Sequence, residues 1–252
     1  MKKRLDRLVF ERGLTQSREK AQALIMAGVV LVNDKPVTKS GALCTGDEAI
    51  RLKQRQDQYV SRGAYKLLAA VENFAISCEG KTAIDIGAST GGFTEVLLLK
   101  GAEKIFSIDV GINQMDWKIR SNPKVRVLEK INARYIEFET VGEKADLIVI
   151  DVSFISLEKV LPSTLQFAHR NTDWITLIKP QFEVGKADVG KGGVVKDPIL
   201  HEQVNQRIKS FGETLGLNLI GLIKSPITGT TGNREFLGHW KHKEFSQSPS
   251  LL

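Results

Sequence analysis

The sequence contains little cysteine and no long apolar run. Cys44 and Cys78 form no CxxC pair and have no histidine beside them, which argues against a zinc site or a disulfide framework. We expect no metal site, and both thiols buried as small apolar groups in a reducing cytosol. The longest apolar stretch, 23–32, has about half the length of a membrane-spanning helix. Charged residues from Asp6 onward interrupt any apolar core behind the basic start, so we expect a soluble, cytoplasmic protein.

The net charge of +7 is concentrated near the N-terminus. Residues 1–55 hold 12 Lys and Arg against 6 Asp and Glu, whereas the remaining 24 basic and 23 acidic residues nearly cancel. A compact basic segment on a neutral body favours a module that binds a polyanion such as nucleic acid. A charged surface that only aids solubility is the alternative at this point.

Residues 1–55 are expected to form a small α+β domain. Apolar residues recur at helical spacing before Gly13, and Ser17 and Gly28 are typical of the start and the end of a second helix. Short runs of β-branched and apolar residues, separated by turn residues, then indicate strands. The expected strands are 29–32, 35–37 and 48–52.

From Lys81 onward, strand-like and helix-like segments alternate. That rhythm predicts an α/β domain, Rossmann-like, with a parallel sheet covered by helices on both faces. A helix is expected within 59–78, with Tyr65, Leu68, Ala69 and Glu72 at helical spacing. The expected strands are 82–86, 104–109, 125–128, 146–151 and 174–178, followed by a terminal hairpin of 217–223 and 235–240 on the sheet edge. The expected domain boundaries are 1–55, a linker at 56–60, 61–245 and a tail at 246–252.

A glycine-rich turn follows the first expected strand of the α/β domain. A P-loop is excluded because Phe93, not Lys, follows Gly92, and the spacing does not fit the dinucleotide pattern G-x-G-x-x-G. An acidic residue followed by Gly-x-x-x-Gly-Gly is typical of a site for S-adenosylmethionine (SAM). A P-loop-like run at 185–191 lacks the hydroxyl residue and is expected to be a flexible basic loop. The loop residues expected to bind the cofactor are Asp85, Gly87, Ala88, Ser89, Thr90, Gly91, Gly92 and Phe93.

Three further strand ends carry polar side chains. Asp109, followed by Val110, can accept hydrogen bonds from both ribose hydroxyls of a nucleoside, and the amide of Asn132 can reach an adenine edge. Asp151 ends the fourth strand. Because the carboxyl ends of parallel strands meet at one edge of a sheet, we expect these residues to converge on SAM. The alternative is that each of them only ends a strand.

The residues present narrow the choice of methyl acceptor. Methylation of a pyrimidine carbon needs a cysteine nucleophile near the fourth or sixth strand, where the sequence has none. Methylation of an exocyclic amine usually goes with Asn/Asp-Pro-Pro-aromatic, whereas residues 151–154 read Asp-Val-Ser-Phe. A ribose 2′-hydroxyl needs a base or a stabilised alkoxide, which lysines ordered by carboxylates can supply. The candidates for that chemistry are Lys66, Asp151, Lys179 and Glu235.

These four residues resemble the Lys-Asp-Lys-Glu tetrad of FtsJ-type ribose 2′-O-methyltransferases. The N-terminal residues resemble the S4 RNA-binding domain, and together with segments 61–67 and 109–111 they make the chain similar to the TlyA haemolysin/rRNA methyltransferase family. The resemblance implies SAM-dependent 2′-O-methylation of cytidine in ribosomal RNA. In that picture Lys179 activates the hydroxyl, Asp151 and Glu235 hold the lysines, and Lys66 positions the acceptor. The S4-like residues are Arg4-Leu5-Asp6, Ser17-Arg18, Ala21, Leu24-Ile25, Gly28, Val30, Val32-Asn33 and Lys39.

The resemblance also predicts the partners. We expect ribosomal RNA or ribosomal subunits as the partner, no membrane, and a monomer or weak homo-oligomer. Two alternatives remain: a pore-forming haemolysin, against which the lack of a spanning segment and of a long amphipathic basic helix argues, and an RNA chaperone that binds SAM without catalysis. The residues expected to contact RNA are Arg4, Arg7, Arg18, Lys20, Lys35 and Lys39.

Overall fold

The computed structural model describes residues 2–15, 17–52 and 59–243. The chain divides into two compact units, residues 1–58 and residues 59–252, which are described separately below. Residues 56–58 of the expected linker and the whole expected tail, 246–252, lie outside the described residues.

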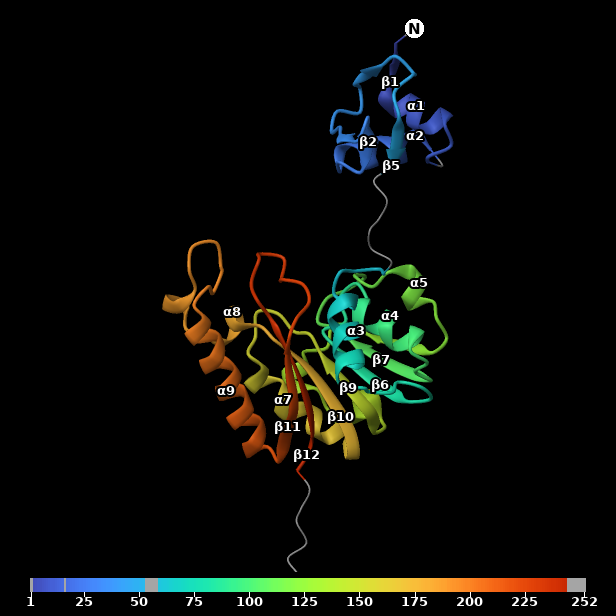
Figure 1. Ribbon diagram of the computed structural model, residues 1–252. Helices are drawn as coiled ribbons and strands as arrows, with labels where there is room; N and C mark the ends of the chain where they lie inside the picture. The colour runs from blue at the N-terminus through green and yellow to red at the C-terminus, as the bar shows by residue number, and fades with distance from the viewer. Residues whose placement is uncertain (1, 16, 53–58, 244–252) are drawn as a thin grey trace, which may run out of the picture. The chain divides into compact units, whose positions relative to one another are not determined.

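The N-terminal unit packs two helices against short antiparallel strands (Figure 1). Ser17 Oγ accepts a hydrogen bond from the backbone N–H of Lys20 at 3.2 Å, which confirms Ser17 as the N-cap of the second helix. Asn33 and Asp34 both have positive φ, the conformation of a tight turn between twisted antiparallel strands. The helices are α1 (Leu5–Glu11) and α2 (Arg18–Met26), and the strands are β1 (Lys3–Arg4), β2 (Val30–Val32), β3 (Lys35–Pro36), β4 (Leu43–Cys44) and β5 (Ile50–Leu52).

The expected α+β organisation of this unit is confirmed. Its core is an apolar cluster in which Leu5 and Val9 of α1 meet Ile25 of α2 and Val30 of β2. The pair formed by β1 and β4 was not predicted, because two-residue strands carry too few side chains to show a period of two.

The C-terminal unit is built on a seven-stranded mixed sheet in the order β11-β12-β10-β9-β6-β7-β8. The five strands from β10 to β8 are parallel, whereas β12 runs antiparallel between β10 and β11. The terminal hairpin on the sheet edge is therefore confirmed. The chain leaves β6 toward β7 and returns to β9 on the other side, so the switch in strand order lies between β6 and β9. The strands are β6 (Thr82–Ile86), β7 (Lys104–Ile108), β8 (Val125–Leu128), β9 (Ala145–Ile150), β10 (Ala168–Ile178), β11 (Leu217–Lys224) and β12 (Phe236–His242).

Helices cover both faces of this sheet, as the sequence predicts (Figure 1). Because successive strand residues point to opposite faces, Ile84 packs in the apolar cluster that includes α9, whereas Ala83 packs in the cluster that includes α3 and α4. The larger helices are α3 (Ala64–Asn73), α4 (Gly92–Leu99) and α9 (Pro198–Thr214). The short ones are α5 (Trp117–Arg120), α6 (Phe138–Val141), α7 (Leu161–Thr164) and α8 (Pro180–Glu183).

Two elements differ from their predicted form. The helix expected within 59–78 covers only α3, and its buried apolar residues are Ala64, Leu67, Ala70 and Val71 rather than the four residues named from the sequence. Both sets have helical spacing, and packing against α4 buries the first set, with Lys66 buried beside it. Strand β10 begins at Ala168, well before the expected residue 174. The sequence did not predict this start, because the first half of the strand carries polar side chains in place of an apolar run. There Thr172 Oγ1 donates to the backbone oxygen of Ala145 at 2.6 Å.

Candidate active site

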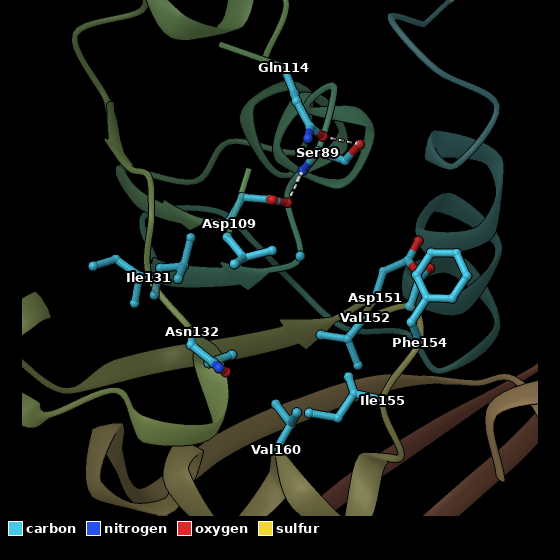
Figure 2. A pocket seen from close by; sticks show the side chains of 15 residues that line it. Ser89, Asp109, Gln114, Ile131, Asn132, Asp151, Val152, Phe154, Ile155 and Val160 are labelled. Atoms are coloured by element: carbon cyan, nitrogen blue, oxygen red, sulfur yellow. Dashed lines mark hydrogen bonds between the residues drawn. The ribbon is translucent and has the colours of Figure 1, made fainter. Parts of the chain in front are cut away.

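A pocket of about 470 Å³ opens at the carboxyl ends of the parallel strands, where ligands bind in open α/β folds. Figure 2 shows its polar side chains, Ser89, Asp109 and Asn132, arranged around the cavity with apolar side chains beside them. We call it the Asp109 pocket. Some of the residues expected to bind the cofactor line this pocket: Gly87, Ser89, Asp109, Val110, Asn132 and Asp151.

Gly87 explains why the loop after β6 needs glycine. Its φ is +87°, and a Cβ atom placed there would lie 2.2 Å from the backbone oxygen of Asp151. The ends of β6 and β9 therefore approach too closely for any side chain. A second glycine, Gly92, allows the start of α4 to approach Ser61, whose Oγ would lie 2.1 Å from an added Cβ. The glycine pattern thus sets the shape of this edge of the sheet.

Asp109 is held rigidly at the end of β7. One carboxylate oxygen accepts the N–H of Ser89 at 2.8 Å, and the other accepts the N–H of Gly111 at 2.7 Å. The side-chain oxygen of Asn132 accepts the N–H of Arg134 at 3.1 Å. Gln114, which the sequence did not single out, also lines the pocket and accepts a hydrogen bond from Ser89 Oγ at 3.3 Å. No motif marks Gln114, because it lies in an irregular loop.

Asp85 does not reach either pocket in this structure. It is fully buried beneath the glycine loop, where it accepts a hydrogen bond from Thr94 Oγ1 at 2.6 Å. Burial raises the pKa of Asp85 to about 7, with a contribution from the nearby charge of Asp151. Thr94 Oγ1 also lies 2.8 Å from Ser107 Oγ of β7. This carboxyl group therefore supports the loop from below rather than forming its surface.

A second pocket, of about 710 Å³, adjoins the first, and we call it the lysine pocket. The two pockets share Gly87, Ser89, Asp151, Ser153 and Phe154. Four loop residues assigned to the cofactor, Ala88, Thr90, Gly92 and Phe93, line the lysine pocket instead, and Gly91 lines neither. All four members of the predicted tetrad line the lysine pocket: Lys66, Asp151, Lys179 and Glu235.

The tetrad forms two lysine–carboxylate pairs. Lys66 Nζ lies 2.6 Å from Glu235 Oε2, and Lys179 Nζ lies 2.6 Å from Asp151 Oδ1. Lys179 also donates to Ser153 Oγ at 2.8 Å. Both lysines are 8% exposed and Glu235 is 2% exposed, so the charges are largely removed from water. Because removing charge from water is costly, ion pairs buried at a pocket are typical of a functional site.

Phe154 lies in the wall that the two pockets share. Its side chain is 92% exposed, its φ is +63°, and its ring centroid lies 5.0 Å from that of Phe182. A bulky residue in the left-handed region is uncommon and is found at functional sites more often than elsewhere. In the sequence, Phe154 stands out only as the aromatic end of a motif that lacks its two prolines, so its place in the wall was not predicted.

In the N-terminal unit, the six basic residues expected to contact RNA are all exposed. Two of them are also structural: Arg4 donates to the buried carboxylate of Asp6 at 2.9 Å, and Arg18 lies 3.2 Å from it. Hydrogen bonds, first from Arg4, hold the pKa of Asp6 far below its usual range. Arg7 pairs with Glu11 at 2.6 Å. The sequence did not reveal that one buried carboxylate orients two of the arginines.

Expectations from the sequence also concern the cysteines, metal binding and membrane-spanning helices. Cys44 and Cys78 are both buried, as expected. Among residues 2–15, 17–52 and 59–243, no three His, Cys, Asp or Glu side chains are grouped so as to hold a metal ion. None of the helices in the part that the structure describes is long and apolar enough to cross a membrane.

Comparison with protein families decides the identity of both units. A model described as FtsJ-like methyltransferase matches residues 59–242. This chain belongs to the FtsJ-like methyltransferase family. The S4 domain model matches residues 3–50, so the FtsJ-like unit follows an S4 domain. The predicted fold, a Rossmann-like methyltransferase domain with a small α+β RNA-binding domain, is confirmed.

Whole-chain relatives of the FtsJ-like protein confirm the resemblance to the TlyA family. The 16S/23S rRNA (cytidine-2'-O)-methyltransferase TlyA of Mycobacterium tuberculosis is 44% identical over 92% of this chain and 87% of its own length. Hemolysin A of Brachyspira hyodysenteriae is 42% identical over 94% of this chain and 99% of its own length. A solved structure from Streptococcus thermophilus with a provisional hemolysin name is 39% identical, covers 96% of this chain and 89% of its own, and has a TM-score of 0.74.

Proposed function

We propose that this chain transfers the methyl group of SAM to the 2′-hydroxyl of a cytidine in ribosomal RNA. The observation that carries the proposal is the pair of buried lysine–carboxylate contacts in a pocket that shares a wall with the Asp109 pocket. The name of the M. tuberculosis relative, which specifies a cytidine 2′-O-methyltransferase, supports the choice of acceptor.

The residues of the Asp109 pocket fit SAM. The carboxylate of Asp109 can accept hydrogen bonds from the two ribose hydroxyls, and the amide nitrogen of Asn132 can donate to an adenine ring nitrogen, because the amide oxygen is already used. Apolar side chains of Ile131, Ile155 and Val160 line the same cavity and can enclose a purine. When bound, SAM supplies a methyl group on a cationic sulfonium.

The lysine pocket accounts for activation of the acceptor. A ribose hydroxyl becomes nucleophilic when its proton is removed or when the developing alkoxide is stabilised. Lys179 Nζ, fixed by Asp151 and Ser153, is placed to activate a hydroxyl in the lysine pocket. Lys66, fixed by Glu235, supplies a second cation to the same pocket and would position the acceptor. Asp151 lines both pockets, so the activating group lies beside the SAM site.

RNA binding is assigned to both units. The S4 domain presents exposed Arg and Lys side chains, and its net charge suits contacts with the phosphates of folded RNA. The target nucleotide must leave its stack to place its ribose in the lysine pocket. The exposed ring of Phe154, beside Phe182, offers a stacking surface for that base. The proposed partner is ribosomal RNA or a ribosomal subunit, and the protein is proposed to act in the cytoplasm as a monomer or weak homo-oligomer.

The test is methyl transfer from labelled SAM to separated small and large ribosomal subunits, with the modified nucleotide mapped by mass. We expect a 2′-O-methylcytidine in at least one subunit. Lys179→Ala should reduce turnover by about 1,000-fold while SAM still binds, and Asp109→Ala should abolish SAM binding. Methylation of a base instead of a ribose, or full activity of Lys179→Ala, would contradict the proposal. Leakage of liposomes that Lys179→Ala leaves unchanged would support a haemolysin instead.

A further inference from the structure

Glu183, at the end of α8, is a buried charged residue that lines neither of the two pockets. Its side chain is 7% exposed to solvent. One carboxylate oxygen accepts the N–H of Leu157 at 2.8 Å, and the other accepts Ser156 Oγ at 2.7 Å. Arg207 of α9 donates to the same carboxylate at 3.0 Å. A carboxylate with this many charged and neutral donors is strongly held in place.

These contacts join two segments that carry the proposed active site. The segment after β9 carries Asp151, Ser153 and Phe154, and it ends at Ser156, where Glu183 holds it. The segment after β10 begins with Lys179, which is paired with Asp151. The two segments are therefore tied at both ends, by the Lys179–Asp151 pair near the sheet and by Glu183 farther along.

Arg207 extends this tie to α9. Its guanidinium lies 3.0 Å from Glu158, just after Leu157, and it donates to the backbone oxygen of Glu183 at 2.7 Å. The segment after β9, the end of α8 and the middle of α9 therefore meet at one carboxylate. Burial raises the pKa of Glu183 above its ordinary value despite these donors, so the position is costly for a charge. A packed apolar residue could fill the same space but could not hold the N–H of Leu157.

We propose that Glu183 is a positioning residue for methyl transfer, because it fixes the wall between the Asp109 pocket and the lysine pocket. This inference rests on the function proposed above. Asp151, Ser153 and Phe154 of this wall line both pockets, so their displacement changes where Lys179 lies relative to a bound cofactor. Misplacement of reacting groups by about 1 Å costs roughly 100-fold in rate.

The test compares Glu183→Gln with the matched control Glu202→Gln, whose side chain is exposed on α9. Glutamine keeps the size of Glu183 but loses the charge that Arg207 contacts. We expect kcat to fall by about 10- to 100-fold with KM for RNA changed less than about threefold, because the phosphate contacts of the S4 domain, which we expect to dominate RNA affinity, are unaltered. Amide hydrogen exchange should become faster at residues 153–157 while β6 and β9 keep their protection. The control should show neither change.

A milder substitution tests the inference if Glu183→Gln destabilises the whole C-terminal unit. Ser156→Ala removes a single hydrogen bond of the tie and should lower kcat by about three- to tenfold, with faster exchange confined to the same residues. Wild-type kcat in Ser156→Ala together with unchanged local exchange would overturn the inference, as would wild-type kcat in a folded Glu183→Gln. If wild-type protein transfers no methyl group to a ribose, the proposed function fails instead, and the exchange experiment still reports whether Glu183 holds residues 153–157.

Discussion

Replacement of Gly87 by alanine tests the geometry on which the site depends. The new Cβ would lie 2.2 Å from the backbone oxygen of Asp151 and 2.8 Å from its carbonyl carbon, so the end of β9 must move. A positive φ costs an alanine about 1–2 kcal/mol, and overpacking of this kind adds about 1–3 kcal/mol. We therefore expect the free energy of unfolding to fall by roughly 2–5 kcal/mol.

Gly142→Ala is the matched control. Gly142 follows α6 with a φ of +80°, close to that of Gly87, but nothing lies within 4 Å of an added Cβ. It should lose only the backbone contribution of about 1–2 kcal/mol. Urea unfolding followed by tryptophan fluorescence measures both variants, and the three tryptophans, Trp117, Trp174 and Trp240, all report on the C-terminal unit.

Methyl transfer provides the second measurement. Displacement of Asp151 disturbs its 2.6 Å contact with Lys179, so Gly87→Ala should lose about 100-fold in rate, whereas Gly142→Ala should keep its activity. Equal losses of stability in the two variants, or normal methyl transfer by a folded Gly87→Ala protein, would refute the close approach of β6 and β9 as the reason for the glycine.

Three other predictions concern charge and stacking. The double substitution Lys35→Ala with Lys39→Ala should weaken RNA binding and leave SAM affinity, measured by calorimetry, unchanged. The slope of log binding constant against log salt concentration should become shallower by roughly one unit per lost phosphate contact. An unchanged slope would show that these lysines do not contact phosphates. Phe154→Ala should lower kcat/KM for RNA by about 10- to 100-fold if the ring stacks on the target base, and equal loss in Phe154→Tyr would argue against stacking. Asp85→Asn should become progressively more stable than wild type as pH rises from about 4 to about 7. The folded protein favours the protonated carboxyl because its pKa is about 7, so ionisation costs wild-type stability in that range, and a pH-independent difference between the denaturation curves would contradict this.

Much of the site could be predicted because it lies at strand ends. Asp109, Asp151 and Lys179 each follow an apolar strand, and parallel strands bring their carboxyl ends to one edge of the sheet. Lys66 and Glu235 lie near the start of other elements, were named as candidates for hydroxyl activation, and were then matched to a tetrad. The structure places all four tetrad members in one pocket, although their roles in catalysis stay a prediction.

The rest could not be predicted because it depends on contacts between distant segments. Nothing in the sequence indicates that Asp85 lies beneath the loop and not on its surface, since both placements fit a strand end. The burial of one face of α3 depends on α4, and the orientation of Arg4 depends on Asp6. The exposure of Phe154 could not be predicted, because a loop residue belongs to no periodic pattern of buried and exposed positions.

The place of β12 in the sheet has a consequence for the synthesis of the chain. It is the last strand of the described chain, yet it lies between β10 and β11, and its Trp240 donates to Thr176 of β10 at 2.9 Å. Until residues 236–242 leave the ribosome, β10 keeps an unpaired edge of the kind that chaperones and aggregates recognise. Glu235 arrives in the same step, so a nascent chain cannot complete its Lys66–Glu235 pair before the sheet closes.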